Sequence, residues 1–260
     1  MPRGCDPGRV KPPLFEYHSP TTVEEACALL ATFEDAKILA GGQSLVPLLN
    51  FRLARPQHLV DINRVDGLDR IYERDGGVAV RALVRQAAVE DSPLVARVCP
   101  LLTDAIRLVA HRVIRNRGTV CGSLAHADPA SELPAVLLVL GGHVVAQSKS
   151  RGDRVIGADQ LFTGVMETTL APDELMVEAW FPAIADQFAM SEESRRHGDF
   201  ALAGAVRAGS RLALFGVAPT PVLADPGDPT RGLQPSGDLE ATPEFRLHLV
   251  RVLAERVLAA

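Results

Sequence analysis

Cysteine is scarce in this chain of 260 residues, which has four, at Cys5, Cys27, Cys99 and Cys121. They form no C-x-x-C pair, and no histidine stands at zinc-ligand spacing from them. The sequence therefore indicates neither a disulfide framework nor a metal site, and it lacks the cysteine cluster that would hold an iron–sulfur centre. We expect reduced thiols and a cytoplasmic protein.

Long apolar runs and excess positive charge are missing as well. The longest apolar stretch, residues 135–146, contains two glycines and a histidine and is shorter than the ~20 residues that a spanning helix needs. The first residues lack the apolar centre of a signal peptide. Lys and Arg number 27 against 32 Asp and Glu, and the net charge of −5 disfavours nonspecific attraction to nucleic acid or anionic lipid. We expect no membrane span and no nucleic-acid partner.

The remaining composition is that of a globular protein, with 47% hydrophobic and 23% charged residues. Its length allows one large domain or two modest ones. We expect a flexible tail over residues 1–13, an ordered region over 14–185 and a smaller unit over 186–260.

Local patterns predict the main elements. The capping-box spacing of Thr22 and Glu25 predicts a helix that ends near Phe33. Strands and helices follow from periodicity and from turn residues. Single strands are expected at 37–40, 59–62, 143–147, 154–156 and 175–181, and hairpins at 70–81 and at 200–207 with 211–217. Helices are expected at 45–52, within 84–113, at 134–140 and from Thr242, the last with an apolar stripe of Phe245, Leu249, Val252, Leu253 and Val257. We expect a linker at 186–193 and a loop at 219–241.

The first segment that could carry chemistry is Ala40-Gly41-Gly42-Gln43-Ser44. Two glycines at a strand end can expose successive backbone amides, which would wrap a phosphate or pyrophosphate without any lysine. The segment is neither a P-loop nor G-x-G-x-x-G. A plain tight turn is the alternative interpretation.

The second segment runs over residues 118–133. Its small residues would let the backbone approach a ligand closely, Thr119 and Ser123 offer hydroxyls, and Asp128 and Glu132 could accept hydrogen bonds from ribose or adenine. A polar loop before a helix is the alternative. Ser44 and Ser123 lack the G-x-S-x-G pattern, so hydrolysis is not supported.

The two segments together, Ala-Gly-Gly-Gln-Ser and Gly-Thr-Val-Cys-Gly-Ser-Leu-Ala-His-Ala-Asp-Pro, resemble the FAD-binding medium subunit of molybdenum hydroxylases. That family includes the flavoprotein subunit of aerobic carbon monoxide dehydrogenase and the FAD domain of xanthine dehydrogenase. Further matches stand at residues 15–17, 178–182, 195–204 and 245–249. The resemblance spans nearly the whole chain, and it depends on the order and spacing of these motifs.

The resemblance implies an α+β fold: an FAD-binding domain of the vanillyl-alcohol-oxidase (PCMH) type over residues 14–185, with two α+β lobes that meet near residues 65–70, followed by a small C-terminal α/β domain. It implies that the two glycine segments bracket the FAD pyrophosphate, that His126, Asp128 and Glu132 lie near the adenosine half, and that Met176 faces the isoalloxazine edge. The implied cofactor-binding residues are Leu39, Ala40, Gly41, Gly42, Gln43, Ser44, Leu45, Thr119, Val120, Cys121, Gly122, Ser123, His126, Asp128, Glu132 and Met176. No catalytic or metal-ligating residue is implied.

The implied function is electron transfer from the iron–sulfur clusters of a small partner subunit to FAD and on to an external acceptor. A large partner subunit would hold the molybdenum cofactor, and the complex would be a doubled heterotrimer. Two alternatives stay open: a self-sufficient FAD oxidoreductase of the same fold, of the enolpyruvyl-sugar reductase or alcohol oxidase type, and a flavin-free interaction module.

Two features depart from the family, and a third segment leaves two interpretations. Cys121 stands where the family more often has glycine, so its side chain must fit close to the diphosphate or the turn must shift. The region between Val217 and Thr242 is shorter than usual. The basic run at residues 111–117 is a solvated helix end or a docking surface for the iron–sulfur partner.

Overall fold

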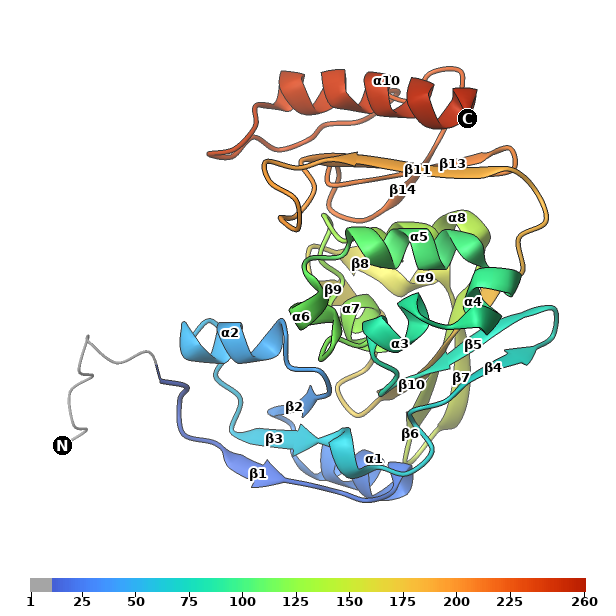
Figure 1. The fold of residues 1–260 in the computed structure, drawn as a ribbon. Helices are drawn as coiled ribbons and strands as arrows, with labels where there is room; N and C mark the ends of the chain where they lie inside the picture. The colour runs from blue at the N-terminus through green and yellow to red at the C-terminus, as the bar shows by residue number, and fades with distance from the viewer. Residues whose placement is uncertain (1–10) are drawn as a thin grey trace.

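The computed structural model describes residues 11–260, in which four sheets are surrounded by helices (Figure 1). Most of the predicted tail, residues 1–13, lies outside the described part. None of the helices in that part is both long and apolar enough to cross a membrane.

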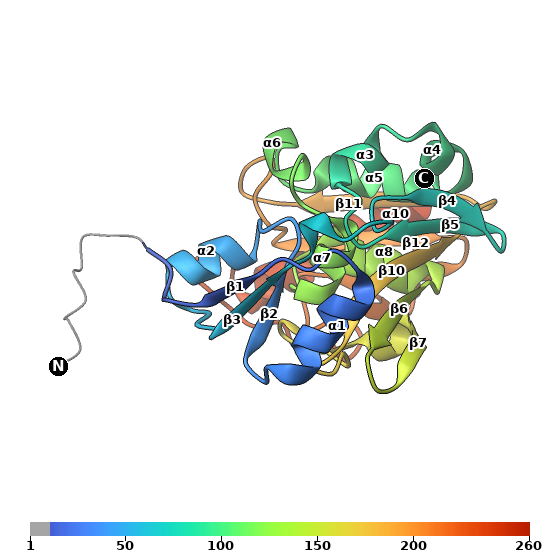
Figure 2. The same cartoon turned by 90° about the horizontal axis from the view of Figure 1, so that it is seen from below.

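The N-terminal layer is a parallel three-stranded sheet in the order β1-β3-β2. It lies to one side of the molecule with its two helices (Figure 2). Its elements are β1 (Glu16–His18), α1 (Val23–Thr32), β2 (Ala36–Leu39), α2 (Leu45–Asn50), β3 (His58–Asp61) and the 3-10 turn η1 (Ile62–Arg64). Helix α1 begins as predicted, because Thr22 Oγ1 accepts a hydrogen bond from the Glu25 amide at 3.1 Å.

The central sheet has five strands in the order β4-β5-β10-β6-β7, and neighbouring strands are antiparallel. The strands are β4 (Ile71–Arg74), β5 (Gly77–Arg81), β6 (His143–Ser148), β7 (Gly152–Gly157) and β10 (Leu175–Pro182). Apolar side chains of this sheet and of the helices beside it form the main core. The predicted strands at 70–81, 143–147, 154–156 and 175–181 are confirmed.

Helices pack around this sheet, together with a two-stranded ribbon of β8 (Phe162–Gly164) and β9 (Glu167–Thr168). They are α3 (Gln86–Glu90), α4 (Pro93–Val98), α5 (Pro100–Leu108), α6 (Arg112–Arg115), α7 (Val120–His126), α8 (Glu132–Leu140) and α9 (Ala158–Leu161). Helix α8 is buried on all sides from Glu132 to Val139. A helix that is apolar all round needs partners on every side, and α8 contacts α5 as well as strands of the C-terminal sheet.

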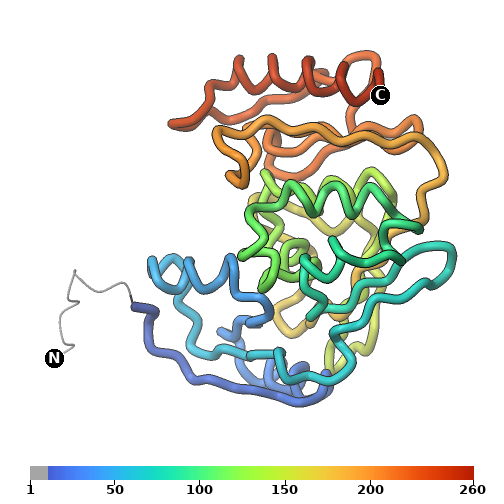
Figure 3. The backbone as a smooth tube through the Cα atoms, viewed as in Figure 1, coloured from blue at the N-terminus to red at the C-terminus, as the bar shows by residue number. Residues whose placement is uncertain are grey.

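The C-terminal sheet is antiparallel, in the order β11-β12-β13-β14. Its strands are β11 (Phe188–Glu193), β12 (Ala203–Ala208), β13 (Arg211–Phe215) and β14 (Val222–Ala224), and α10 (Pro243–Ala259) follows. The sheet lies between α10 on one face and α5 with α8 on the other (Figures 1 and 3). The second predicted hairpin is confirmed.

Two predictions for this region are wrong. The expected linker at 186–193 contains β11, and the expected loop at 219–241 contains β14. Strand β11 pairs along its whole length with β12, and its apolar residues Phe188, Ala189 and Met190 pack against the cores on both sides of the sheet. Because β11 also contains polar residues, its sequence did not indicate a strand.

The apolar stripe predicted for α10 is also partly wrong. Phe245 and Val252 are exposed, whereas Arg246 is only 7% exposed and occupies a core-facing position. Its guanidinium donates to the carbonyls of Leu202 and Gly216 and pairs with Asp238 at 2.5 Å. Because these bonds pair both terminal nitrogens of the guanidinium, an arginine takes a position that hydropathy assigns to an apolar residue.

Candidate functional site

The two glycine segments touch each other in the structure. A Cβ atom added to Gly41 would lie 2.3 Å from the Arg117 carbonyl oxygen and 2.9 Å from the Gly118 Cα. A real side chain at position 41 would therefore collide with the backbone of the second segment. Glycine at position 41 is what lets the two segments approach this closely.

Two polar side chains hold the segments in place. Asn63 Nδ2 donates to the Ala40 carbonyl at 2.8 Å, and Arg85 Nη2 donates to Asn63 Oδ1 at 2.6 Å. The other arm of the same guanidinium, Nη1, donates to the Arg117 carbonyl at 2.9 Å. Burial, and then the positive charge of Arg117, lower the pKa of Arg85. We call Asn63 and Arg85 the bridging pair.

Sequence reasoning missed the bridging pair. Asn63 stands two residues after Asp61 at the end of β3, and Asp61 Oδ1 accepts from its backbone amide at 2.9 Å. This Asx-type turn is a recognisable local signal. Arg85 carries no such signal, because its role comes from tertiary contacts alone.

The first segment connects β2, which ends at Leu39, to α2, which begins at Leu45. Gly42 has a φ of +74°, which favours glycine. The backbone amides between Gly41 and Ser44 have no acceptor among residues 11–260, and Gln43 turns its side chain back to the Gly41 carbonyl at 3.3 Å. The segment thus offers unpaired N–H groups next to a helix start, an arrangement suited to an anion.

The second segment forms the start of α7. Thr119 is the N-cap, and its Oγ1 accepts from the Gly122 amide at 3.0 Å, while Val120 is buried. Ser123 Oγ lies 3.1 Å from Ser131 Oγ, which connects α7 to the residue before α8.

The side chain of Cys121 points into the core, so the expectation that it fits close to a diphosphate is wrong. It is 3% exposed, and its Sγ points to the Val80 carbonyl of β5 at 3.6 Å. Burial raises the pKa of the thiol to about 12. Because α7 begins at Val120, the side chain at position 121 faces the core instead of a ligand.

The residues expected near adenosine follow α7 closely. His126 is the last residue of α7 and is half-buried. Asp128 Oδ1 accepts from the Ala130 amide at 2.9 Å, which orders the loop before α8. Glu132 begins α8 and is 4% exposed.

Glu132 lies in an unusual electrostatic environment. Burial, followed by the charge of Glu192, raises the pKa of the Glu132 carboxyl to about 8. Burial raises the pKa of Glu192 to about 7, and its Oε2 has no partner among the described residues. Glu192 belongs to β11, so the charge that raises the pKa of Glu132 comes from the C-terminal sheet.

Met176 does not join the other predicted residues at a surface. It is 4% exposed in β10 and belongs to the main core. Its apolar side chain packs among other apolar side chains of the core and carries no hydrogen-bond donor for a ligand.

The basic run at 111–117 is only partly a solvated helix end. Arg115 is buried, pairs with Glu90 at 2.9 Å, and donates to two backbone carbonyls. Arg112 pairs with Glu90 and Asp91. These carboxylates neutralise much of the charge that a docking surface would present.

The structure also has two open pockets, one beside His18 and one lined by residues between Gly67 and Arg81. Neither contains a residue of the glycine segments. The case for a ligand at those segments depends on backbone contact and unpaired amides.

Residues 13–184 match the family described as "FAD binding domain in molybdopterin dehydrogenase". The chain belongs to this family. The match covers both glycine segments and the bridging pair, and it confirms the resemblance found in the sequence.

Similar proteins support the assignment. The 6-hydroxypseudooxynicotine dehydrogenase complex subunit alpha of Paenarthrobacter nicotinovorans is 39% identical, over 96% of this chain and 95% of the relative. The nicotine 6-hydroxylase medium subunit of the same organism is 46% identical, over 75% of this chain and 68% of the relative. A chain of carbon monoxide dehydrogenase from Hydrogenophaga pseudoflava matches in structure with a TM-score of 0.90, 35% identity, and coverage of 96% and 97%.

These matches confirm the α+β FAD-binding fold, the oxidoreductase class and FAD as the cofactor of this molybdopterin dehydrogenase subunit. They decide against a flavin-free interaction module. The relatives are themselves components of multi-subunit dehydrogenases, which favours a subunit over a self-sufficient oxidoreductase.

Proposed function

We propose that this chain receives electrons from iron–sulfur clusters of a partner subunit and passes them to an external acceptor. Bound FAD supplies the redox chemistry, and the protein provides binding, orientation and electrostatics. The observation that carries the proposal is the backbone contact between Gly41 and the Arg117–Gly118 peptide. This contact puts side by side the two segments whose backbone amides would bind the pyrophosphate.

The proposed pyrophosphate-binding residues are 39–45 and 119–123. Unpaired amides at Gly41 to Ser44 would donate to phosphate oxygens. Thr119 Oγ1 and the Gly122 amide already bond each other, so in the second segment the turn is shaped before a ligand arrives. Val120 and Cys121 would act through their backbone only, because their side chains are buried.

His126, Asp128 and Glu132 are the proposed neighbours of the adenosine half. With a pKa of about 8, the Glu132 carboxyl is mostly protonated at neutral pH, so it can donate a hydrogen bond as well as accept one. We do not extend the proposal to Met176, since its side chain is buried in the main core.

The proposed partners are a large subunit with the molybdenum cofactor and a small subunit with 2Fe–2S clusters, in a doubled heterotrimer. Two relatives are named as subunits of dehydrogenase and hydroxylase assemblies. The four cysteines lack cluster-binding spacing, which supports the placement of the clusters in another chain. Substrate would then be chosen outside this subunit.

The domain boundaries belong to the same proposal. Residues 65–70 connect η1 of the parallel sheet to β4 of the central sheet, which supports a boundary between lobes there. A second apolar cluster joins α10 to the C-terminal sheet, which supports a separate unit from residue 186 onward.

The test of this proposal adds one methyl group at position 41. Gly41→Ala puts a Cβ where the Arg117 carbonyl lies, so we expect the purified variant to lose FAD, as measured by flavin absorbance per chain. Gly227→Ala is the matched control, because its added Cβ would meet only Asp225 Oδ1, at 3.4 Å. Circular dichroism verifies that Gly41→Ala is folded. Full FAD content in folded Gly41→Ala would overturn the proposed cradle.

A further inference from the structure

Two histidines and a glutamate meet on one face of the N-terminal sheet, away from the residues proposed for FAD. Glu16 and His18 are two residues apart in β1, so their side chains lie on the same face. His58 begins β3 and is the register partner of Glu16 in the parallel pairing of the two strands. The topology thus brings together residues that are far apart in the sequence.

The ligand atoms of these residues have metal-site spacing. His18 Nε2 lies 3.1 Å from His58 Nδ1, and Glu16 Oε2 lies 3.5 Å from His58 Nδ1. All three atoms lie within 4.8 Å of one another. Ligand atoms at 2.0–2.1 Å around a tetrahedral zinc ion are about 3.3 Å apart, so a small movement would place these atoms around one ion.

Phe33, the C-cap of α1, holds the two imidazoles in position. Its ring stacks on His58 with centroids 3.8 Å apart and planes 15° apart, and on His18 at 5.0 Å and 25°. Stacking fixes the ring planes before any ion arrives. This preorganisation is independent of the ligand spacing and lowers the ordering cost of coordination.

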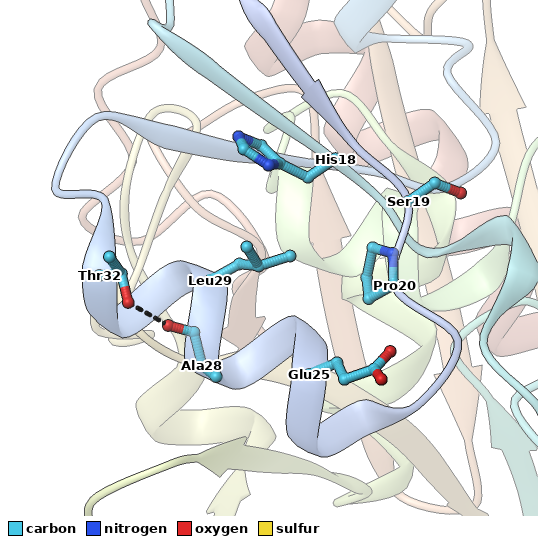
Figure 4. A pocket seen from close by; sticks show the side chains of 7 residues that line it. All are labelled: His18, Ser19, Pro20, Glu25, Ala28, Leu29 and Thr32. Carbon is cyan, nitrogen blue, oxygen red and sulfur yellow. Dashed lines mark hydrogen bonds between the residues drawn. The ribbon is translucent and has the colours of Figure 1, made fainter.

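The cluster also has access to solvent. The side chain of Glu16 is 74% exposed, and that of His58 is 17% exposed. His18 is at the edge of an open pocket of about 440 Å³ formed with one face of α1 from Glu25 to Thr32, where Figure 4 shows its ring above Leu29. Water from this side can complete the coordination, as in sites with three protein ligands and one open position.

We propose that Glu16, His18 and His58 bind a divalent transition metal ion of the zinc class. Two imidazoles and one carboxylate suit Zn²⁺, Cu²⁺, Ni²⁺ or Co²⁺ better than the oxygen-preferring Mg²⁺ or Ca²⁺. The ion would tie β1 to β3, the one strand that β1 pairs with among the described residues. Its role is to hold β1 on the sheet that also carries β2 and the first glycine segment.

The competing explanation is a proton between the two imidazoles, with Glu16 as a neighbouring negative charge. Both explanations require the same distances, but they differ in what the site takes up. A metal site binds an ion when the imidazoles are neutral, whereas a proton-bridged pair binds none. The experiment therefore measures metal uptake directly.

The test uses the full chain, stripped with a chelator and then dialysed against Zn²⁺ at slightly alkaline pH. We expect wild type to bind one equivalent that His18→Gln and Glu16→Gln lose, as measured by elemental analysis. His248→Gln, at an exposed position on α10, is the matched control and keeps it. Zn²⁺ should also raise the Tm of wild type and of His248→Gln, but not of the two site variants.

Because the Glu16 side chain is mostly exposed, Glu16→Gln remains folded even where His18→Gln does not. Wild type that takes up no Zn²⁺, or site variants that take up as much as wild type, would overturn the proposal. Flavin absorbance of each variant is measured in parallel. Unchanged FAD content with lost Zn²⁺ supports a metal site that is separate from the proposed cofactor cradle.

Discussion

Arg85 donates one hydrogen bond to Asn63 at 2.6 Å and, from the other arm of its guanidinium, a second to the Arg117 carbonyl. This geometry needs two donors held in a plane, which arginine has and lysine lacks. The bond network continues from Asn63 to the Ala40 carbonyl, so a single side chain fixes the spacing of both glycine segments.

Arg85→Lys should therefore weaken FAD binding and lower the stability by about 1.5–3 kcal/mol, the value of a lost hydrogen bond that involves a charged group. Flavin fluorescence titration measures the first effect, and urea unfolding measures the second. Arg231→Lys is the control, since Arg231 is mostly exposed and forms surface pairs only. Unchanged FAD affinity in Arg85→Lys would contradict the role of the bridging pair.

Glu132 should make the folded state less stable as pH rises. Burial raises its pKa in the fold to about 8, from an ordinary value of 4.5. The folded chain thus holds a proton that the unfolded chain has released, so this contribution to stability is complete below about pH 4.5 and is lost as pH rises toward 8. Glu192 changes the stability in the same direction with pH, because burial raises its pKa to about 7.

Glu132→Gln replaces the carboxyl with a neutral amide of similar shape that does not titrate. We expect it to flatten the decrease of the free energy of unfolding between pH 5 and 8, measured by urea denaturation of FAD-free chain. Glu255→Gln, at an exposed position of α10, should leave the wild-type slope unchanged. An equal slope in Glu132→Gln and wild type would show that Glu132 is ionised in the fold.

The three cysteines of the described part should resist alkylation. Cys27, Cys99 and Cys121 are all buried, and burial raises their pKa values, to about 11 for Cys99 and about 12 for Cys121. Only the thiolate reacts with iodoacetamide. Mass spectrometry should find these residues unmodified in native protein and modified in urea; rapid native labelling of Cys121 would contradict its inward orientation.

Arg246 should be important for the C-terminal unit. Arg246→Met keeps much of the apolar stem but removes the bonds to two carbonyls and to Asp238, and we expect a loss of about 2–4 kcal/mol, because buried acceptors lose their partner. Thermal unfolding measures this loss. Asp238→Asn should cost less, since Asp238 is half exposed and the backbone contacts of Arg246 remain.

Local sequence signals predicted the elements that local forces determine. The Thr22 cap, the glycine pair after β2 and the hairpin at residues 70–81 depend on neighbours in the chain, and the structure has them in the expected places. The family resemblance predicted that the two glycine segments lie on either side of one pyrophosphate, but the direct approach of Gly41 to Arg117 was not predicted. No periodicity relates Gly41 to Arg117.

Tertiary contacts explain the failures. Strand β11 is polar in composition but is stabilised by pairing with β12, and Arg246 is buried because distant carbonyls accept its hydrogen bonds. The orientation of Cys121 depends on the residue at which α7 begins. The cluster of His18 and His58 was invisible because parallel pairing of β1 and β3, not sequence proximity, brings the two rings together.

The burial of α8 between two sheets has a consequence for synthesis. Strands β12 and β13, which cover one side of this helix, come more than sixty residues after its first turn. A ribosome making ~5–20 residues per second would leave that side uncovered for several seconds. The nascent chain is therefore most exposed to aggregation or chaperone capture just before the second hairpin emerges, and a truncation ahead of β11 would make that temporary state permanent.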